Sequence, residues 1–198
     1  MVNLVASDCV GGRYFEKLNS EYKNPFIWNS FKLSDFIHLV KFWDSINFDN
    51  IESYISTGEY GKFKDVPTLI LDGSMRLYFH HHHQMDDKKT PVKLHLDIDN
   101  IDLGYCDILG YLEEKWHKRL QRMKGEPVFC YNDKPVAKNA DIMEYINLDT
   151  NYNRILITCD SKYKQYEDKK LKVYIKPIQI MNSTVLCNDL YNKGYFDF

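Results

Sequence analysis

The second half of the chain alternates apolar runs with amphipathic segments, and this alternation limits the possible folds more than any other feature. Apolar runs typical of buried strands cover residues 127–131, 153–158 and 171–175, and a helical pattern covers residues 141–148 between the first two. Strands that alternate with helices in this way normally build a parallel sheet covered by helices. We therefore predict an α/β protein.

The first half adds a second kind of pairing. An apolar run at residues 3–8, followed by Cys9 and the pair Gly11-Gly12, predicts a strand, a tight turn and a helix. A helix is expected over residues 33–46, capped by Ser34 or Ser30, and residues 47–64 are expected to be irregular or a short helix. Asp72-Gly73 between two apolar runs predicts an antiparallel hairpin.

Residues 107–124 carry the clearest helical pattern in the chain, and a strand is expected at residues 92–96. The length of 198 residues suits one domain of ordinary size. We predict a single α/β domain over residues 1–198, with a central, mostly parallel sheet, an antiparallel hairpin and helices on both faces.

Charge and hydropathy exclude several classes of protein. The chain has 26 Lys and Arg against 28 Asp and Glu, a net charge of -2 that argues against a general nucleic-acid or anionic-membrane binder. It has no apolar run long enough to span a bilayer. The first twenty residues lack the basic and apolar regions of a secretion signal, so the expected compartment is the cytoplasm.

The five cysteines form no CxxC pair, which argues against a disulfide framework or a four-cysteine zinc site. Cys130 and Cys159 lie in apolar strand patterns and are predicted to be core residues, whereas Cys106 and Cys187 are interpreted as incidental. Cys9 lies where a strand gives way to a helix, and helix N–H groups there favour a thiolate and can hold an oxyanion. The alternative is a buried, small apolar side chain beside a Gly-Gly turn.

Four histidines, residues 80–83, follow the apolar strand pattern MRLYF. Alternate strand residues point to opposite faces, so His81 and His83 are the candidates to face inward and to act as a base for Cys9. Asp72, Asp86 or Asp87 could orient that imidazole. A second interpretation uses two of these histidines with Asp86 or Asp87 as metal ligands, and a third leaves a solvated strand end. We predict neither a metal nor a cofactor.

Lys115, Arg119 and Arg122 share one stripe on the long predicted helix, next to Trp116. Such a stripe can hold a phosphate or a carboxylate. The alternative is a solvated face on which the neighbouring glutamates, Glu113 and Glu114, pair with these cations.

Taken in order, SDCVGGRYFEKLNSEYKNPFIW, FHHH, EEKWHKRLQRM, PVFCYND and RILITCD resemble a bacterial family of unknown function whose members are labelled exopolysaccharide or capsule biosynthesis proteins. The resemblance covers roughly residues 3 to 160. Carried over position by position, the family's motifs fall on Cys9, Gly11, Gly12, Pro25, Phe26, His81, Trp116, Arg119 and Arg122.

A family described as papain-like cysteine peptidases has a similar layout, with a PFDW segment and a His-Asp pair after a strand. In this chain Ile27 stands where that family has the Asp of PFDW, and His82 follows the strand histidine.

The resulting hypothesis is acyl transfer or hydrolysis in surface-polysaccharide biosynthesis. Cys9 attacks a carbonyl, His81 or a neighbour moves the proton, and the N–H groups of Val10 and Gly11 hold the oxyanion. The predicted catalytic residues are Cys9, His81, His83 and Asp86. The predicted binding residues for an anionic sugar, nucleotide-sugar or lipid-phosphate group are Gly11, Gly12, Trp28, Trp116, Arg119 and Arg122.

Two alternatives keep the binding site but not the covalent step. One is a noncatalytic module that binds a sugar phosphate or a nucleotide. The other is a transferase in which an Asp or a His acts as the base.

Overall fold

A computed structural model of the chain describes residues 2–20, 22, 24–55, 67–79, 82–85, 91–94, 105–133, 137–177 and 182–198. For residues 55, 82–85, 91–94, 105–108 and 111 it describes the backbone only. The elements, in chain order, are β1 (Asn3–Ala6), α1 (Val10–Lys17), β2 (Asn29–Ser30), α2 (Leu33–Phe42), the 3-10 helix η1 (Trp43–Ser45), β3 (Ile51–Ile55), β4 (Pro67–Leu71), β5 (Met75–Phe79), β6 (His82–Met85), β7 (Pro91–Leu94), α3 (Tyr105–Leu120), β8 (Pro127–Asn132), α4 (Asn139–Ile146), β9 (Asn153–Thr158), the 3-10 helix η4 (Ser161–Tyr166), β10 (Leu171–Ile175) and α5 (Ser183–Asn192).

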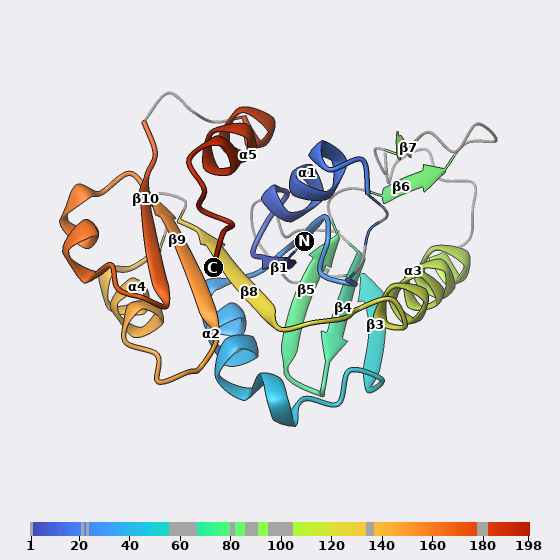
Figure 1. Ribbon diagram of the computed structural model, residues 1–198. Coiled ribbons are helices and arrows are strands. Elements are labelled where there is room, and N and C mark those ends of the chain that lie inside the picture. Colours follow the sequence, from blue (N-terminus) through green and yellow to red (C-terminus); the bar gives the residue numbers. More distant parts are fainter. Residues whose placement is uncertain are drawn as a thin grey trace.

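A four-stranded sheet in the order β1-β8-β9-β10 lies at the centre of the fold, and all three of its strand pairs are parallel (Figure 1). Every residue of β1 and of β8 is buried, as expected for strands covered on both faces. The predicted α/β class, with its parallel sheet, is therefore confirmed.

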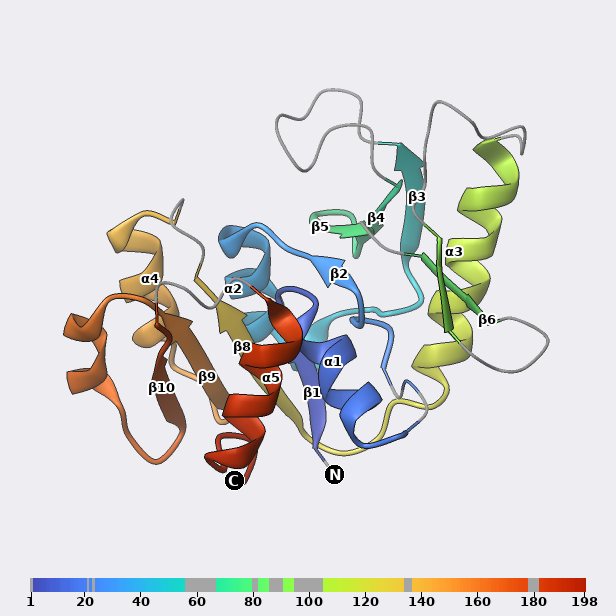
Figure 2. The same cartoon turned by 90° about the horizontal axis from the view of Figure 1, so that it is seen from above.

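Helices cover both faces of this sheet. α1 and α5 lie side by side on one face, and α2 and α4 lie on the other, as the view from above shows (Figure 2). Side chains of β8 alternate between the two cores: Val128 and Cys130 pack with α1 and α5, whereas Phe129 and Tyr131 pack with α2 and α4.

The predicted hairpin is confirmed as β4 and β5, the middle of an antiparallel sheet in the order β2-β5-β4-β3. Its turn places Asp72 and Gly73 at φ 50 and φ 70, the left-handed region that Asp and Gly tolerate best. One apolar cluster joins this sheet, through Phe36 on α2 and Trp116 on α3, to the parallel sheet.

Two predictions in the first half are wrong. Residues 51–55 form strand β3 instead of an irregular segment or short helix, because they pair along their whole length with β4. The N-cap residue of the second helix is Lys32, which makes no side-chain capping bond, and not a serine, since Ser30 belongs to β2 and Ser34 lies inside α2. That helix also changes to 3-10 geometry at Trp43.

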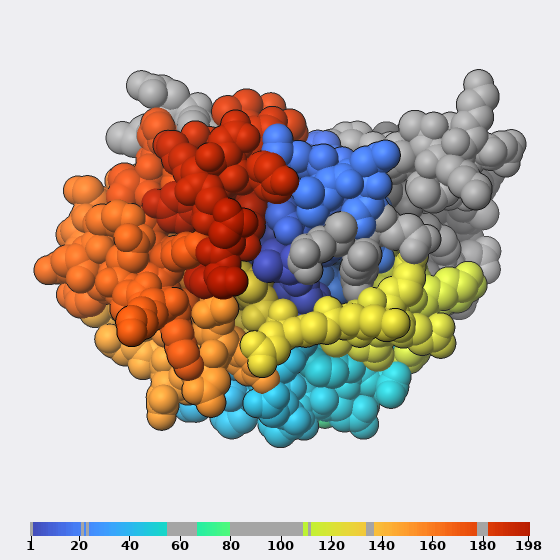
Figure 3. All heavy atoms as spheres, in the orientation of Figure 1, coloured from blue at the N-terminus to red at the C-terminus, as the bar shows by residue number. Residues whose placement is uncertain are grey.

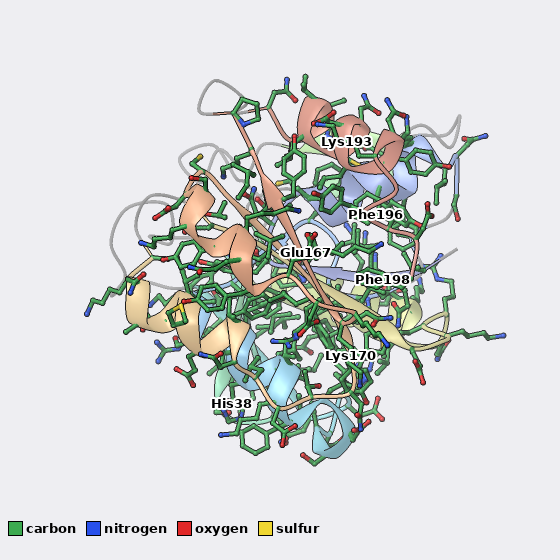
Figure 4. The ribbon with its side chains drawn as sticks, turned by 60° about the vertical axis from the view of Figure 1, so that its left-hand side comes forward. His38, Glu167, Lys170, Lys193, Phe196 and Phe198 are labelled. Atoms are coloured by element: carbon green, nitrogen blue, oxygen red, sulfur yellow. The ribbon has the colours of Figure 1, made fainter. Side chains whose placement is uncertain are left out.

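The C-terminal segment packs on the N-terminal part of the chain, and the surface view shows the two in contact (Figure 3). The Phe196 ring lies 4.7 Å from the Tyr14 ring of α1, between ring centroids. Figure 4 shows Lys193, Phe196 and Phe198 in order from the end of α5 along the sheet. Among the described residues, the helices are too short or too polar to cross a membrane.

Candidate functional site

Polar residues follow three strands of the parallel sheet at their carboxyl ends. Ser7-Asp8 follows β1, Asn132-Asp133 ends β8, and Cys159-Asp160 follows β9. Because the strands are parallel, their carboxyl ends meet at one edge of the sheet, which is where ligands bind in open α/β folds. We call this group the carboxyl-edge site.

A chain of hydrogen bonds holds the β1 side of the site. The buried Asp8 carboxylate accepts one hydrogen bond from the Val10 N–H (3.0 Å) and another from Asn132 Nδ2 (2.7 Å). Lys176 Nζ donates to Asn132 Oδ1 at 2.8 Å and to the Asp133 carbonyl at 2.7 Å. These bonds link residues after β1, β8 and β10, so the edge is held in one arrangement.

Asp133 is the least satisfied group of the site. Its Oδ2 accepts a hydrogen bond from the Thr158 hydroxyl at 3.0 Å, but its buried Oδ1 has no partner within the part of the chain that the structure describes. Burial raises the pKa of Asp133 against the opposing effects of Thr158 and Lys176. Asp160 differs, because hydrogen bonds from Lys162 lower its pKa.

A cavity of about 280 Å³ opens directly beside these carboxylates, between the start of α4 and η4. Its lining combines two carboxylates, a thiol, an amide, an ammonium group and apolar surface: Asp133, Asp160, Cys159, Asn139, Lys162, Ala137, Ile142 and Tyr163. A second cavity of about 460 Å³ continues along α4 and η4, lined by Asn139, Met143, Lys162, Tyr163, Gln165 and Tyr166. Concave surface with a few polar groups is typical of small-molecule sites.

No protein-family model matches the sequence, and no curated protein matches it.

Cys9 lies at the same edge, next to Asp8. It is the N-cap residue of α1, is half-buried, and makes no side-chain capping bond to the helix. The Val10 N–H, which the sequence hypothesis assigns to an oxyanion, donates instead to Asp8. In this arrangement Val10 stabilises a buried carboxylate of the chain itself.

The chain itself fills the space beside Gly11 and Gly12. A Cβ atom added at Gly12 would lie 2.3 Å from Cε2 of Trp28, and one at Gly11 would lie 3.1 Å from the Ala6 Cβ. Trp28 is buried and is held at φ 68, an uncommon conformation for a bulky residue. Both glycines therefore allow close internal packing of α1.

The predicted base and its orienting carboxylate, His81 and Asp86, lie outside the described residues. His83 lies in β6, where its backbone is paired with Lys93, and nothing is described of its side chain. The pairing of a histidine with Cys9 stays a prediction. Among the residues with described side chains, no group of three or more His, Cys, Asp or Glu could hold a metal ion.

The residues predicted on the long helix have structural contacts. Trp116 is buried and donates from Nε1 to the Phe48 carbonyl at 2.8 Å. Arg119 is 4% exposed, donates to the Ile27 carbonyl at 3.2 Å and lies over the Tyr22 ring. Arg119 thereby ties α3 to the segment before β2.

The other two cations of the stripe differ in their surroundings. Burial, together with the charge of Arg119, lowers the pKa of Lys115 to about 7. Arg122 donates from Nε to the Lys118 carbonyl at 3.1 Å.

Sequence reasoning missed most of the carboxyl-edge site, namely Asp8, Asn132, Asp133, Asp160 and Lys176. The sequence did contain a signal, because an aspartate stands one or two residues after the last residue of each of β1, β8 and β9.

The structure also corrects two cysteine interpretations. Cys159 is exposed and lines the cavity instead of lying in the core, since β9 ends at Thr158. Cys187 is buried in the core between α1 and α5 and is not incidental. Cys130 is buried, as predicted.

Proposed function

We propose that the carboxyl-edge site binds a small, hydroxyl-rich ligand of the sugar or sugar-phosphate class. The observation that carries the proposal is the Asp133 carboxylate, which lines the cavity with one buried oxygen that has no hydrogen-bond partner among the described residues. A buried acceptor of this kind is costly unless a donor reaches it. A ligand hydroxyl becomes a suitable donor when the carboxylate turns this oxygen toward the cavity that it lines.

The rest of the cavity lining fits the same chemistry. Asp160 adds a second carboxylate that can accept a hydrogen bond from a ligand hydroxyl. An acidic residue holds a ribose hydroxyl in the same way in dinucleotide-binding folds. Half-buried Ala137 adds a small apolar contact, whereas Ile142 and Tyr163 are each only 3% exposed and belong mainly to the core. Lys162 supplies a positive charge for a phosphate.

The reaction that this site supports best is group transfer without a covalent enzyme intermediate. Its raised pKa makes Asp133 a better proton acceptor near neutral pH than an ordinary aspartate. In this proposal Asp133 takes the proton of a bound hydroxyl while the hydroxyl oxygen bonds to the electrophilic atom of a second substrate, and the leaving group of that substrate departs with the electrons of the broken bond. This is the transferase alternative of the sequence analysis, with Asp133 as the base.

Cys-dependent acyl transfer or hydrolysis is the second candidate. It is favoured by the position of the half-buried Cys9 thiol at the same edge of the sheet, beside the Asp8 network. A turnover assay separates the two: Cys9→Ser abolishes the covalent reaction and leaves the Asp133 reaction largely intact, whereas Asp133→Asn has the opposite effect.

The biological setting is proposed from the motif resemblance. We place the protein in the cytoplasm, in surface-polysaccharide biosynthesis, with an anionic sugar or sugar phosphate as ligand and no nucleic-acid partner. Deleting the gene should reduce surface polysaccharide, and the Asp133→Asn gene should fail to restore it. Full restoration by that variant would count against Asp133 as a functional residue.

Cys159 offers a direct test of binding, because its exposed thiol lines the cavity. Glucose 1-phosphate should slow alkylation of Cys159 by iodoacetamide, followed peptide by peptide by mass spectrometry. Asp133→Asn should weaken that protection, because the amide oxygen can still accept from Thr158, but an NH2 group then stands in place of the second oxygen and cannot accept from a ligand hydroxyl.

The matched control is Asp49→Asn, at an aspartate whose side chain is 79% exposed and which does not line the cavity. In the Asp49→Asn protein, glucose 1-phosphate should protect Cys159 as strongly as it does in the unaltered protein. Protection that is equal in the Asp133→Asn protein, or absent in the unaltered protein, contradicts the proposed site.

A further inference from the structure

We infer, on the basis of the proposed function, that the ligand consists of two linked rings, the first at the carboxylates and the second against Tyr166. The two cavities described above supply the geometry. They share the lining residues Asn139, Lys162 and Tyr163, so they lie next to each other along α4 and η4, and we treat them as two lobes of one groove. We call the end at Asp133 the carboxylate lobe and the end at Tyr166 the tyrosine lobe.

The sizes of the two lobes favour a ligand larger than one sugar ring. The carboxylate lobe, at about 280 Å³, lies just below the range of about 300–1,000 Å³ that is usual for ligand pockets. The tyrosine lobe, at about 460 Å³, is the larger of the two. A single ring held by Asp133 and Asp160 would leave most of the groove to water.

The tyrosine lobe is lined for a flat or apolar-faced ring. Tyr166 is 37% exposed, although large aromatic side chains are normally buried, and Met143 adds a soft apolar wall. Gln165 is held at the rim, because its Nε2 donates to the Lys162 carbonyl at 2.9 Å. An exposed tyrosine ring can stack on a nucleobase or on the C–H face of a sugar.

Lys162 lies where the two lobes meet and lines both of them. Its ammonium group is 2.7 Å from Asp160 Oδ2 and 4.7 Å from the centre of the Tyr163 ring. A cation at the junction suits a ligand with a polar or anionic bridge between its rings. A disaccharide joins two sugar rings through a glycosidic oxygen, and a nucleotide sugar joins a sugar ring to a nucleoside through a diphosphate.

Protection of Cys159 from iodoacetamide tests the inference with four probes. Glucose and uridine are the single-unit probes; cellobiose and uridine diphosphate glucose, which can place one ring in each lobe, are the two-ring probes. A two-ring probe should protect at concentrations at least about tenfold lower than glucose, because one stacking contact is worth roughly that factor. Stronger protection by uridine diphosphate glucose identifies a nucleotide sugar, and stronger protection by cellobiose identifies a disaccharide.

Variants separate the two lobes. Tyr166→Ala should remove the advantage of the two-ring probe and leave protection by glucose unchanged, whereas Asp133→Asn should weaken protection by both. Tyr191→Ala is the matched control, because Tyr191 is 42% exposed on α5 and does not line the groove.

The outcomes distinguish this inference from the proposed function. The inference is wrong, and the proposed function stands, if glucose protects Cys159 and no two-ring probe protects it better. The same holds if a two-ring probe keeps its full advantage over glucose in the Tyr166→Ala protein. If neither glucose 1-phosphate nor any of the four probes protects Cys159, both are overturned.

Discussion

Replacing Gly12 by alanine tests the packing of α1 on Trp28. The added Cβ would lie 2.3 Å from Cε2 of Trp28 and 2.6 Å from two further ring atoms, where ordinary contacts begin at 3.4 Å. The indole would have to move by about 1 Å in a close-packed core. Trp28 is only 3% exposed and has little room to move.

Overpacking of a core typically costs about 1–3 kcal/mol. The higher helix propensity of alanine offsets up to about 1 kcal/mol of this cost. Because the contact with Trp28 is so close, we expect the cost of overpacking to lie at the upper end of its range. We therefore expect Gly12→Ala to lower the free energy of unfolding by about 2 kcal/mol. For a chain of 198 residues this corresponds to a fall in Tm of about 4–8 °C.

Urea unfolding followed by circular dichroism measures the change. Gly110→Ala is the matched control. Gly110 also lies within a helix, no atom of the described residues lies within 4 Å of an added Cβ, and the variant should gain about 0.5–1 kcal/mol of stability. In a Trp28→Leu background the cost of Gly12→Ala should shrink, because the clashing ring is gone. An unchanged cost in that background, or no cost in either, would refute the packing argument.

Three further predictions concern Asp35, Arg154 and the cysteines. Burial raises the pKa of Asp35 to about 6 against the opposing charges of Lys32 and Arg76, so the native state binds more protons than the unfolded state between about pH 4 and pH 6. Stability should therefore fall as pH rises through that window. Urea unfolding at several pH values should show a smaller fall in the Asp35→Asn protein. An equal dependence of stability on pH in both proteins would contradict the raised pKa of Asp35. Buried Arg154 donates from Nη1 to the carbonyls of Tyr145 and Ile146 at the end of α4. Arg154→Met should therefore lower the free energy of unfolding by about 2–3 kcal/mol in the same assay. The control Lys169→Met, at an exposed position, should change stability little. Iodoacetamide should alkylate Cys159 well before Cys130 and Cys187, and early labelling of either buried thiol would contradict the fold.

The parts of the fold that were predicted well are those specified by local pattern. β9 and β10 have the predicted bounds, because each is a short apolar run between turn residues. The hairpin of β4 and β5 follows from Asp72-Gly73, whose backbone the turn requires.

The missed elements depend on partners that are distant in sequence. β3 has a mixed polar sequence, IESYI, and becomes a strand through its pairing with β4. α5 shows only a weak apolar stripe and is stabilised by packing of Leu186 and Leu190 in the core that it shares with α1.

The site was harder to predict for the same reason. Cys9 and the glycines after it form a local motif that the sequence alone reveals. Asp8 and Asn132, in contrast, are 124 residues apart and come into contact because β1 lies next to β8. Local periodicity does not predict the order of strands in a sheet. Each aspartate could therefore be recognised in the sequence, but their proximity in space could not be predicted.

The pairing of β1 with β8 also has a consequence for how the chain is made. Asn3 pairs with Pro127, so at roughly 5–20 residues per second a ribosome needs about 6–25 s after making β1 before its partner strand begins to appear. During that interval β1 is an apolar segment with unpaired backbone groups, which is a form that aggregates readily. We therefore expect the nascent chain to bind chaperones through residues 3–6 until β8 has emerged, and slower synthesis to lengthen that stage.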